Sequence, residues 1–353
     1  MSISKIAGKA QTVLGLVYGR DLGVTLVHEH LTIDHVQANF APPTDLAQKE
    51  LVDQPLTMDM LHWIQHYRMH NKDNLRLSDE KDIIKEAMFF KNDGGNTIVE
   101  MSNMGINRNP KSLAHISRAT GLNIIMGSGY YVHTCHPEDM DKKSQDDISQ
   151  EIVCDVTEGV DDTGIKSGII GEIGCSWPLH PNEKKVVLAA AKAQRFTGAP
   201  INIHPGRGGN AVFELADILA TAGADLSRVV MSHIDIRVRN IEEQVQLAKI
   251  GCYLEFDNFG WEGPQPADWD PNIDVPSDMQ RIRKVMKLIE FGFIKQILFS
   301  LDICKKIDLN KYGGRGYNHI QKYVVPMMLR QGMTREQIDT ILVDNPRRIL
   351  CFV

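Results

Sequence analysis

The segment GVTLVHEHL, residues 23–31, joins an apolar, β-branched run to two histidines that stand two positions apart. Side chains on a strand alternate between its two faces, so His28 and His30 share one face and Glu29 takes the other. On a helix the two imidazoles would diverge by roughly 200° and could not hold one ion. The segment therefore predicts a buried strand that ends in two imidazoles, which either chelate a metal or hydrogen-bond within the core.

The same pattern, a short apolar strand followed by a longer amphipathic segment, recurs along the chain. With the first segment, eight strands are predicted, at residues 23–31, 96–101, 122–129, 167–174, 199–206, 228–235, 252–259 and 295–302. Helical patterns occupy residues 78–94, 181–198, 240–251 and 277–292, and each of them closes on a glycine. Ser78 is the expected N-cap of the first.

Eight repeats of buried strand and helix predict an α/β protein, a single (β/α)8 TIM barrel that forms one domain over residues 1–353. A doubly wound open sheet would need fewer strands and usually a glycine-rich turn after the first strand, where this chain has HEHLTID. Two connections are long for a barrel, residues 32–78 after the first strand and 260–276 after the seventh. Both are expected to be pocket walls, lids or solvated insertions.

The composition excludes several classes of protein. The chain has 353 residues, 42% hydrophobic and 24% charged, with a net charge of −6. No basic tract indicates a nucleic-acid partner, and no apolar run indicates a signal peptide or a membrane span, so we expect a cytoplasmic protein. The six cysteines are scattered without a C-x-x-C pair and are expected to be reduced thiols.

Polar residues stand at the C-terminal ends of the predicted strands, where such barrels carry their chemistry. They are His28 and His30 on the first strand, Glu172 on the fourth, His204 on the fifth, His233 on the sixth and Asp302 on the eighth. Burying four imidazoles and two carboxylates without a cation would be costly. The set is too large for one tetrahedral zinc and suits two divalent metal ions with a bridging carboxylate and water. Zinc is the first choice, and manganese, cobalt and iron stay open.

Several motifs carry a resemblance that covers nearly the whole chain. They are QTVLGLV, VHEHL, HWIQ, GIIGEIGCSWPL, IHPGR and NPRR. With them the chain resembles the phosphotriesterase branch of the amidohydrolase superfamily, and most closely the animal phosphotriesterase-related proteins. In bacterial phosphotriesterases a carbamylated lysine bridges the metals at the fourth strand. Here Glu172 takes that place, with two oxygens and the same formal charge, so we expect the binuclear centre to be kept.

The resemblance also implies how the ligands divide and what they do. His28, His30 and Asp302 would hold the more buried metal, and His204 and His233 the more exposed one. Two cations lower the pKa of a bridging water towards about 7, and the resulting hydroxide attacks the substrate. Asp302 would accept the proton and pass it to the leaving group.

The resemblance to the phosphotriesterase-related proteins implies a hydrolase for a small molecule, an amidase that cleaves N-acetyltaurine and other N-acyl taurines to taurine and a carboxylic acid. A metal-dependent lactonase or phosphotriesterase, and a ligand-binding protein without catalysis, stay open as alternatives. Relatives are often dimers, so the resemblance also allows a homodimer.

The candidate substrate contacts are Tyr131, Arg207 and Asn258. Related lactonases carry a tyrosine after the third strand, where this chain has Tyr131, and an arginine after the seventh, where Asn258 departs from that pattern. Arg207 follows a candidate ligand by three residues and could hold an anionic group. Arg237 and Arg239 are interpreted as part of a solvated turn, with substrate contact as the alternative.

Overall fold

The computed structural model describes residues 6–208, 210–262 and 275–353. Each of the eight predicted strands is present within its predicted range. They are β3 (Thr25–Glu29), β6 (Thr97–Glu100), β7 (Asn123–Met126), β8 (Ile170–Gly174), β9 (Ile201–His204), β10 (Val229–Met231), β11 (Tyr253–Phe256) and β12 (Ile297–Phe299). Neighbouring strands pair in parallel, as β-strands joined by helical crossovers must.

The strands close into a ring. One sheet has the order β3-β6-β7 and the other β12-β11-β10-β9-β8. The amide of Gly171 donates to the carbonyl oxygen of Ser128 at 2.7 Å, which links β8 to the end of β7. At the other seam the amide of Asp302 donates to the carbonyl oxygen of His28 at 3.2 Å. The molecule is therefore the (β/α)8 barrel that the sequence predicts.

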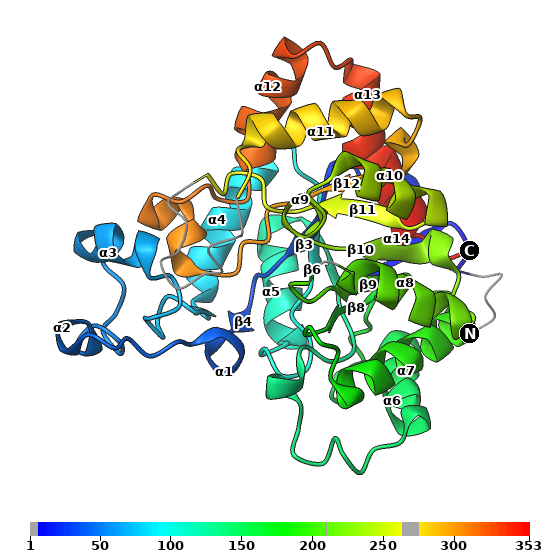
Figure 1. The fold of residues 1–353 in the computed structure, drawn as a ribbon, viewed down its shortest axis with the longest axis horizontal. Coiled ribbons are helices and arrows are strands. Elements are labelled where there is room, and N and C mark those ends of the chain that lie inside the picture. The colour runs from blue at the N-terminus through cyan, green and yellow to red at the C-terminus, as the bar shows by residue number, and fades with distance from the viewer. Residues whose placement is uncertain (1–5, 209, 263–274) are drawn as a thin grey trace.

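Helices alternate with these strands and form the outer layer (Figure 1). They are α4 (Glu80–Asn92), α5 (Pro110–Thr120), α6 (Gln145–Thr157), α7 (Pro181–Thr197), α8 (Ala211–Thr221), α9 (Ile234–Arg237), α10 (Ile241–Ile250) and α11 (Asp278–Glu290), followed by α12 (Val325–Arg330), α13 (Arg335–Asp339) and α14 (Asn345–Leu350). The four predicted helices are α4, α7, α10 and α11. The N-cap prediction for α4 was wrong by one residue, because Asp79 and not Ser78 accepts from the amides of the first turn.

An apolar cluster lies inside the barrel. It joins Val27, Val99 and Ile125 of the strands to Ala10 and Leu350. Ala10 belongs to a hairpin of β1 (Lys9–Thr12) and β2 (Gly15–Tyr18), which the strand pattern did not predict. The amide of Phe352 donates to the carbonyl oxygen of Lys9 at 2.9 Å, so the two ends of the described chain meet at this end of the barrel.

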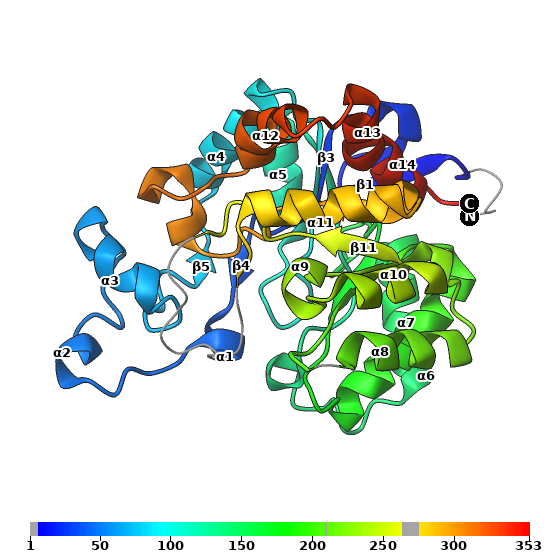
Figure 2. The ribbon, with the colours of Figure 1, turned by 45° about the horizontal axis from the view of Figure 1, so that its top comes forward.

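The long connection at residues 32–78 has structure of its own. It contains α1 (Val36–Asn39), α2 (Leu46–Lys49) and α3 (Leu61–His66), and the short strands β4 (Ile33–Asp34) and β5 (Arg76–Leu77) pair antiparallel at its base. Figures 1 and 2 show α1, α2 and α3 to the left of the barrel, apart from the ring of helices. The connection is thus an insertion with its own elements. Most of the second long connection, residues 263–274, lies outside the described residues.

Among the described helices, none combines the length and apolar character needed to cross a membrane.

Candidate metal centre

Irregular pairing in two strands places the candidate ligands. β3 has one more residue than β6 between Leu26 and Glu29, and β8 has one more than β9 between Ile170 and Ile173. Such bulges re-aim side chains and are common beside active sites. His28 within the bulge of β3 and His30 beyond it both face the cluster. Glu29 points away and accepts from Ser300 Oγ at 2.7 Å, as the two-residue spacing predicts.

The structure brings all six predicted ligands together at the carboxyl ends of the strands. They include two groups of three residues, and within each group the ligand atoms lie within 4.8 Å of one another. The first group is His28, His30 and Asp302, and the second is Glu172, His204 and His233. These are the two groups that the resemblance implies.

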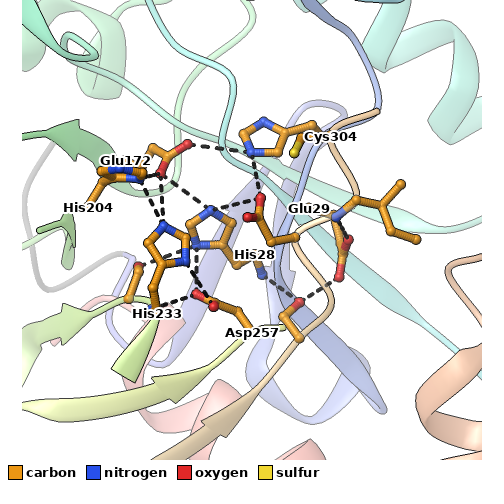
Figure 3. Close-up of polar contacts among 12 residues, drawn as sticks. His28, Glu29, Glu172, His204, His233, Asp257 and Cys304 are labelled. Atoms are coloured by element: carbon orange, nitrogen blue, oxygen red, sulfur yellow. Dashed lines mark hydrogen bonds and ion pairs between the residues drawn. The ribbon is translucent and has the colours of Figure 1, made fainter. Parts of the chain in front are cut away.

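Glu172 belongs to the second group and also contacts the first (Figure 3). Its Oε1 is 3.4 Å from His30 Nε2, and its Oε2 is 3.5 Å from His28 Nε2 and 2.8 Å from His204 Nδ1. Oε1 thus faces His30, Oε2 faces both His28 and His204, and the carboxylate contacts residues of both groups.

The chemistry of the donor set fits metal ions. In three imidazoles the Nδ1 atom is engaged elsewhere: that of His28 lies 3.0 Å from Glu255 Oε2, that of His30 2.9 Å from Ser102 Oγ, and that of His233 2.9 Å from Asp257 Oδ1. This leaves Nε2 as the coordinating atom, as is usual when an outer carboxylate orients a ligand histidine. The Nε2 atom of His28 is buried and has no hydrogen-bond partner among the described residues.

The charges in the cluster are strongly coupled. Burial alone would raise the pKa of Glu172, but the imidazoles of His28 and His204 hold it well below its usual value. Burial would lower the pKa of His28, and the charges of Glu172 and Glu255 outweigh this and raise it. Burial lowers the pKa of His233 to about 3. The shifts keep Glu172 ionised and His233 neutral, the forms that bind metal ions, whereas a cation at His28 would have to displace a proton.

Two of the six residues have a left-handed backbone. His233 has a φ of 58° and Asp302 a φ of 49°, a region that residues other than glycine rarely adopt. Such conformations persist where the surroundings enforce them, and they gather at functional sites. Here the amide of His233 donates to Asp257 Oδ2 at 2.9 Å, and the amide of Asp302 to the carbonyl oxygen of His28. Both side chains are turned into the cluster as a result.

The supporting carboxylates Glu255 and Asp257 were missed by the sequence reasoning. They stand two apart in YLEFDN and therefore share one face of a strand, which is the same signal that identified the histidine pair. Asp257 also forms a third group of potential ligand atoms with His28 and His233. Both of its oxygens already accept from His233, so we assign it to holding that ring.

The three predicted substrate contacts differ in their surroundings. Tyr131 is buried, and its ring centre lies 5.2 Å from that of His204, so it borders the cluster. Asn258 is also buried, but its amide nitrogen donates to Asp257 Oδ1 at 2.6 Å and to Asp235 Oδ1 at 3.2 Å. Arg207 is exposed.

The interpretation of Arg237 as part of a solvated turn was wrong, because its guanidinium is packed beside the cluster, whereas Arg239 is exposed. A further residue that the sequence did not indicate is His35. Its ring stacks on Tyr131 with a centre distance of 5.9 Å and lies 5.6 Å from that of His30. Both ring nitrogens of His35 are buried without a hydrogen-bond partner among the described residues.

The sequence of the whole barrel is similar to known hydrolases. The model of the phosphotriesterase family matches residues 8–350. The N-acetyltaurine hydrolase of Homo sapiens is 43% identical over 351 residues, which is 99% of this chain and 100% of the human one. The phosphotriesterase-related protein of Nematostella vectensis is 44% identical over 350 residues, 98% of this chain and 99% of its own length.

Solved structures are also similar to this chain over nearly its whole length. A resiniferatoxin-binding protein from Rhodobacter sphaeroides has a TM-score of 0.93 at 35% identity and covers 98% of this chain and 95% of its own. The phosphotriesterase homology protein from Escherichia coli, solved with phosphate in its active site, has a TM-score of 0.76 at 28% identity, with 94% and 99% covered. The chain therefore belongs to the phosphotriesterase family of metal-dependent hydrolases and is an enzyme of the hydrolase class.

Proposed function

We propose that this enzyme is a binuclear-metal amidase that hydrolyses N-acetyltaurine and related N-acyl taurines to taurine and a carboxylic acid. The observation that carries the proposal is the pair of ligand groups that share Glu172. The choice of substrate is supported by the N-acetyltaurine hydrolases, which are similar to this chain over their full length.

The residues that would hold the metals follow from the two groups. His28, His30 and Asp302 would hold one cation, His204 and His233 the other, and Glu172 both. When bound, a pair of divalent cations supplies an activated water and polarises the substrate carbonyl. Imidazole and carboxylate ligands suit zinc, which is our first choice.

Asp302 is the residue we propose as proton acceptor. Its side chain is 21% exposed and that of His204 is 17% exposed, whereas those of His28 and Glu172 are 0% and 2% exposed, so Asp302 is the carboxylate ligand that substrate and water can reach. Burial would raise its pKa, but the hydrogen bond from His30 and the charges of the imidazoles lower it instead. An ionised carboxylate can take a proton from the attacking water and pass it to the leaving amine.

The proposal is tested by acetate release from N-acetyltaurine, followed by proton NMR with protein loaded with two equivalents of zinc. We expect release by the native enzyme and loss of it in Glu172→Ala. Glu86→Ala is the matched control, because Glu86 is a buried carboxylate that accepts from the amides of Asn310 and Lys311, away from the cluster. The metal content of each variant is measured alongside.

Release that is unchanged in Glu172→Ala would contradict the bridging assignment. No release from a protein that holds two metals would contradict the amidase. Lactones and phosphotriesters are then the substrates to compare, and inactivity towards all of them would leave a ligand-binding protein.

A further inference from the structure

Arg237 lies between the two strand ends that supply His204 and His233. It ends the short helix α9, which begins directly after His233. Its Nε donates to the carbonyl oxygen of Pro205 at 3.1 Å, and Pro205 is the residue after His204. The plane of the guanidinium is therefore anchored beside the second ligand group.

One end of this guanidinium has no acceptor. The Nη1 atom is buried and has no hydrogen-bond partner among the described residues. Burial and the nearby positive charge of Arg207 lower the pKa of Arg237 to about 10, so the group is still a cation at neutral pH. A buried charged donor that lacks an acceptor is costly to the fold. An oxygen atom of a ligand would supply the acceptor that Arg237 Nη1 lacks.

The acidic neighbours do not fill this role. Asp235 and Asp257 are close enough to raise the pKa of Arg237, but their oxygens serve other donors. Asp235 accepts from Arg281 Nε at 2.6 Å and from Asn258 Nδ2 at 3.2 Å. Asp257 accepts from the amide of His233 and from Asn258. Among the described residues, therefore, no acceptor reaches Arg237 Nη1, and a ligand oxygen could take that place.

We propose that Arg237, with the positive charge of Arg207 beside it, binds the anionic tail of the substrate, a sulfonate or a similar oxyanion. The proposal rests on the proposed function and names its specificity-determining residue. In an N-acyl taurine the sulfonate is two carbons from the amide nitrogen, so an amide at the cluster places the sulfonate close by. Tyr131, whose ring borders His204, is also close enough to influence the charge of Arg237.

The chemistry of the pair suits an oxyanion. A guanidinium presents several donors in one plane and matches the oxygens of carboxylate, phosphate and sulfonate groups. A second cation nearby adds attraction for an anion and disfavours a neutral or cationic tail. The site would therefore select substrates by charge, while the cluster acts on the amide that all of them share.

The test compares kcat/KM for N-acetyltaurine with that for N-acetylethanolamine, a neutral amide of similar size. In Arg237→Met we expect a fall of about 100-fold for N-acetyltaurine and a change within about threefold for the neutral amide, because a lost charged hydrogen bond affects only the anion. Arg237→Lys should recover part of the loss. Arg239→Met, an exposed arginine two residues along, is the matched control and should behave as the native enzyme. An equal fall for both amides would overturn the proposal.

A binding measurement separates this proposal from the amidase itself. Ethanesulfonate carries the tail without the amide, and its affinity for the zinc-loaded enzyme can be measured by calorimetry whether or not N-acetyltaurine is hydrolysed. Binding that weakens at least about tenfold in Arg237→Met and not in Arg239→Met supports the site. No binding to the native enzyme, or equal binding to both variants, would overturn it. Thermal unfolding of each variant shows whether the fold is kept.

Discussion

Single residues outside the set of six candidate ligands also shape the site, because they hold the ligand side chains in place. Glu255 is buried on β11, and its Oε2 lies 3.0 Å from His28 Nδ1 while it accepts from Ser232 Oγ at 2.6 Å and Asn202 Nδ2 at 2.9 Å. These contacts hold the His28 ring through Nδ1. The unengaged Nε2 is thereby presented to the centre of the cluster.

We expect Glu255→Gln to weaken zinc binding by about 10–100-fold, because an amide holds the His28 ring less firmly and removes a negative charge from behind it. Competition with a chromophoric chelator measures the affinity. Glu86→Gln, a buried carboxylate elsewhere in the barrel, should bind zinc as the native enzyme does. Equal affinities in both variants would show that Glu255 does not orient a ligand.

At the scale of the element, the start of α7 ties together the loops that border the site. Glu183, in the first turn of α7, accepts from the amide of His133 at 2.9 Å, of Ser176 at 2.8 Å and of His180 at 3.1 Å. His133 follows β7 just after Tyr131, and Ser176 follows β8. One buried carboxylate therefore holds the loop that carries Tyr131 against the end of β8.

Glu183→Ala should lower the free energy of unfolding by about 1–3 kcal/mol, because three partly buried amides lose a charged acceptor. Burial would raise the pKa of Glu183, but the donors from His133 and Ser176 lower it below 4.5. A carboxyl with a lowered pKa stabilises the fold above its unfolded pKa, and this contribution is lost as the pH falls through the lower, folded value.

The difference in the free energy of unfolding between the native protein and Glu183→Gln should therefore be largest at pH 7. It should become smaller as the pH falls below about 4.5. Urea unfolding at pH 7, 5 and 4 measures it. A difference that does not change with pH would mean that the charge of Glu183 contributes nothing.

At the scale of the whole molecule, the proposed cations would join parts of the chain that are far apart in sequence. The six candidate ligands come from β3, β8 and β9 and from the segments after β10 and β12, so they span both sheets of the barrel and one of its seams. The apolar cluster inside the barrel contains none of these ligands. A homodimer and the single-domain organisation stay predictions.

Removal of metal with a chelator is expected to lower the midpoint of thermal unfolding by roughly 5–10 °C, because ligands that bind only the folded state stabilise it by mass action. The far-UV circular dichroism should stay unchanged, since the apolar core keeps the barrel together. Zinc added back should restore the midpoint. A midpoint that does not respond to chelator or zinc would contradict a metal centre in this fold.

Much of the architecture and the candidate site can be predicted from local pattern. The eight strands are short apolar runs between amphipathic segments, and parallel strands in a barrel place their carboxyl ends at one rim. That rule brings together His28, Glu172 and Asp302 although they are far apart in the sequence. Among the exceptions at this level were the hairpin of β1 and β2, which was not predicted, and Ser78, where two adjacent capping residues made the helix start ambiguous by one position.

The barrel and the set of residues at its rim can be predicted from the sequence, because strand alternation and strand ends are local properties of the chain. The place of Arg237 beside the cluster, the stacking of His35 on Tyr131 and the helices of residues 32–78 outside the ring are visible in the folded chain alone. Those outcomes depend on which distant segments meet. A bulge in β8, or a helix of four residues after His233, has no signature that a single sequence reveals before the neighbouring strands are in register.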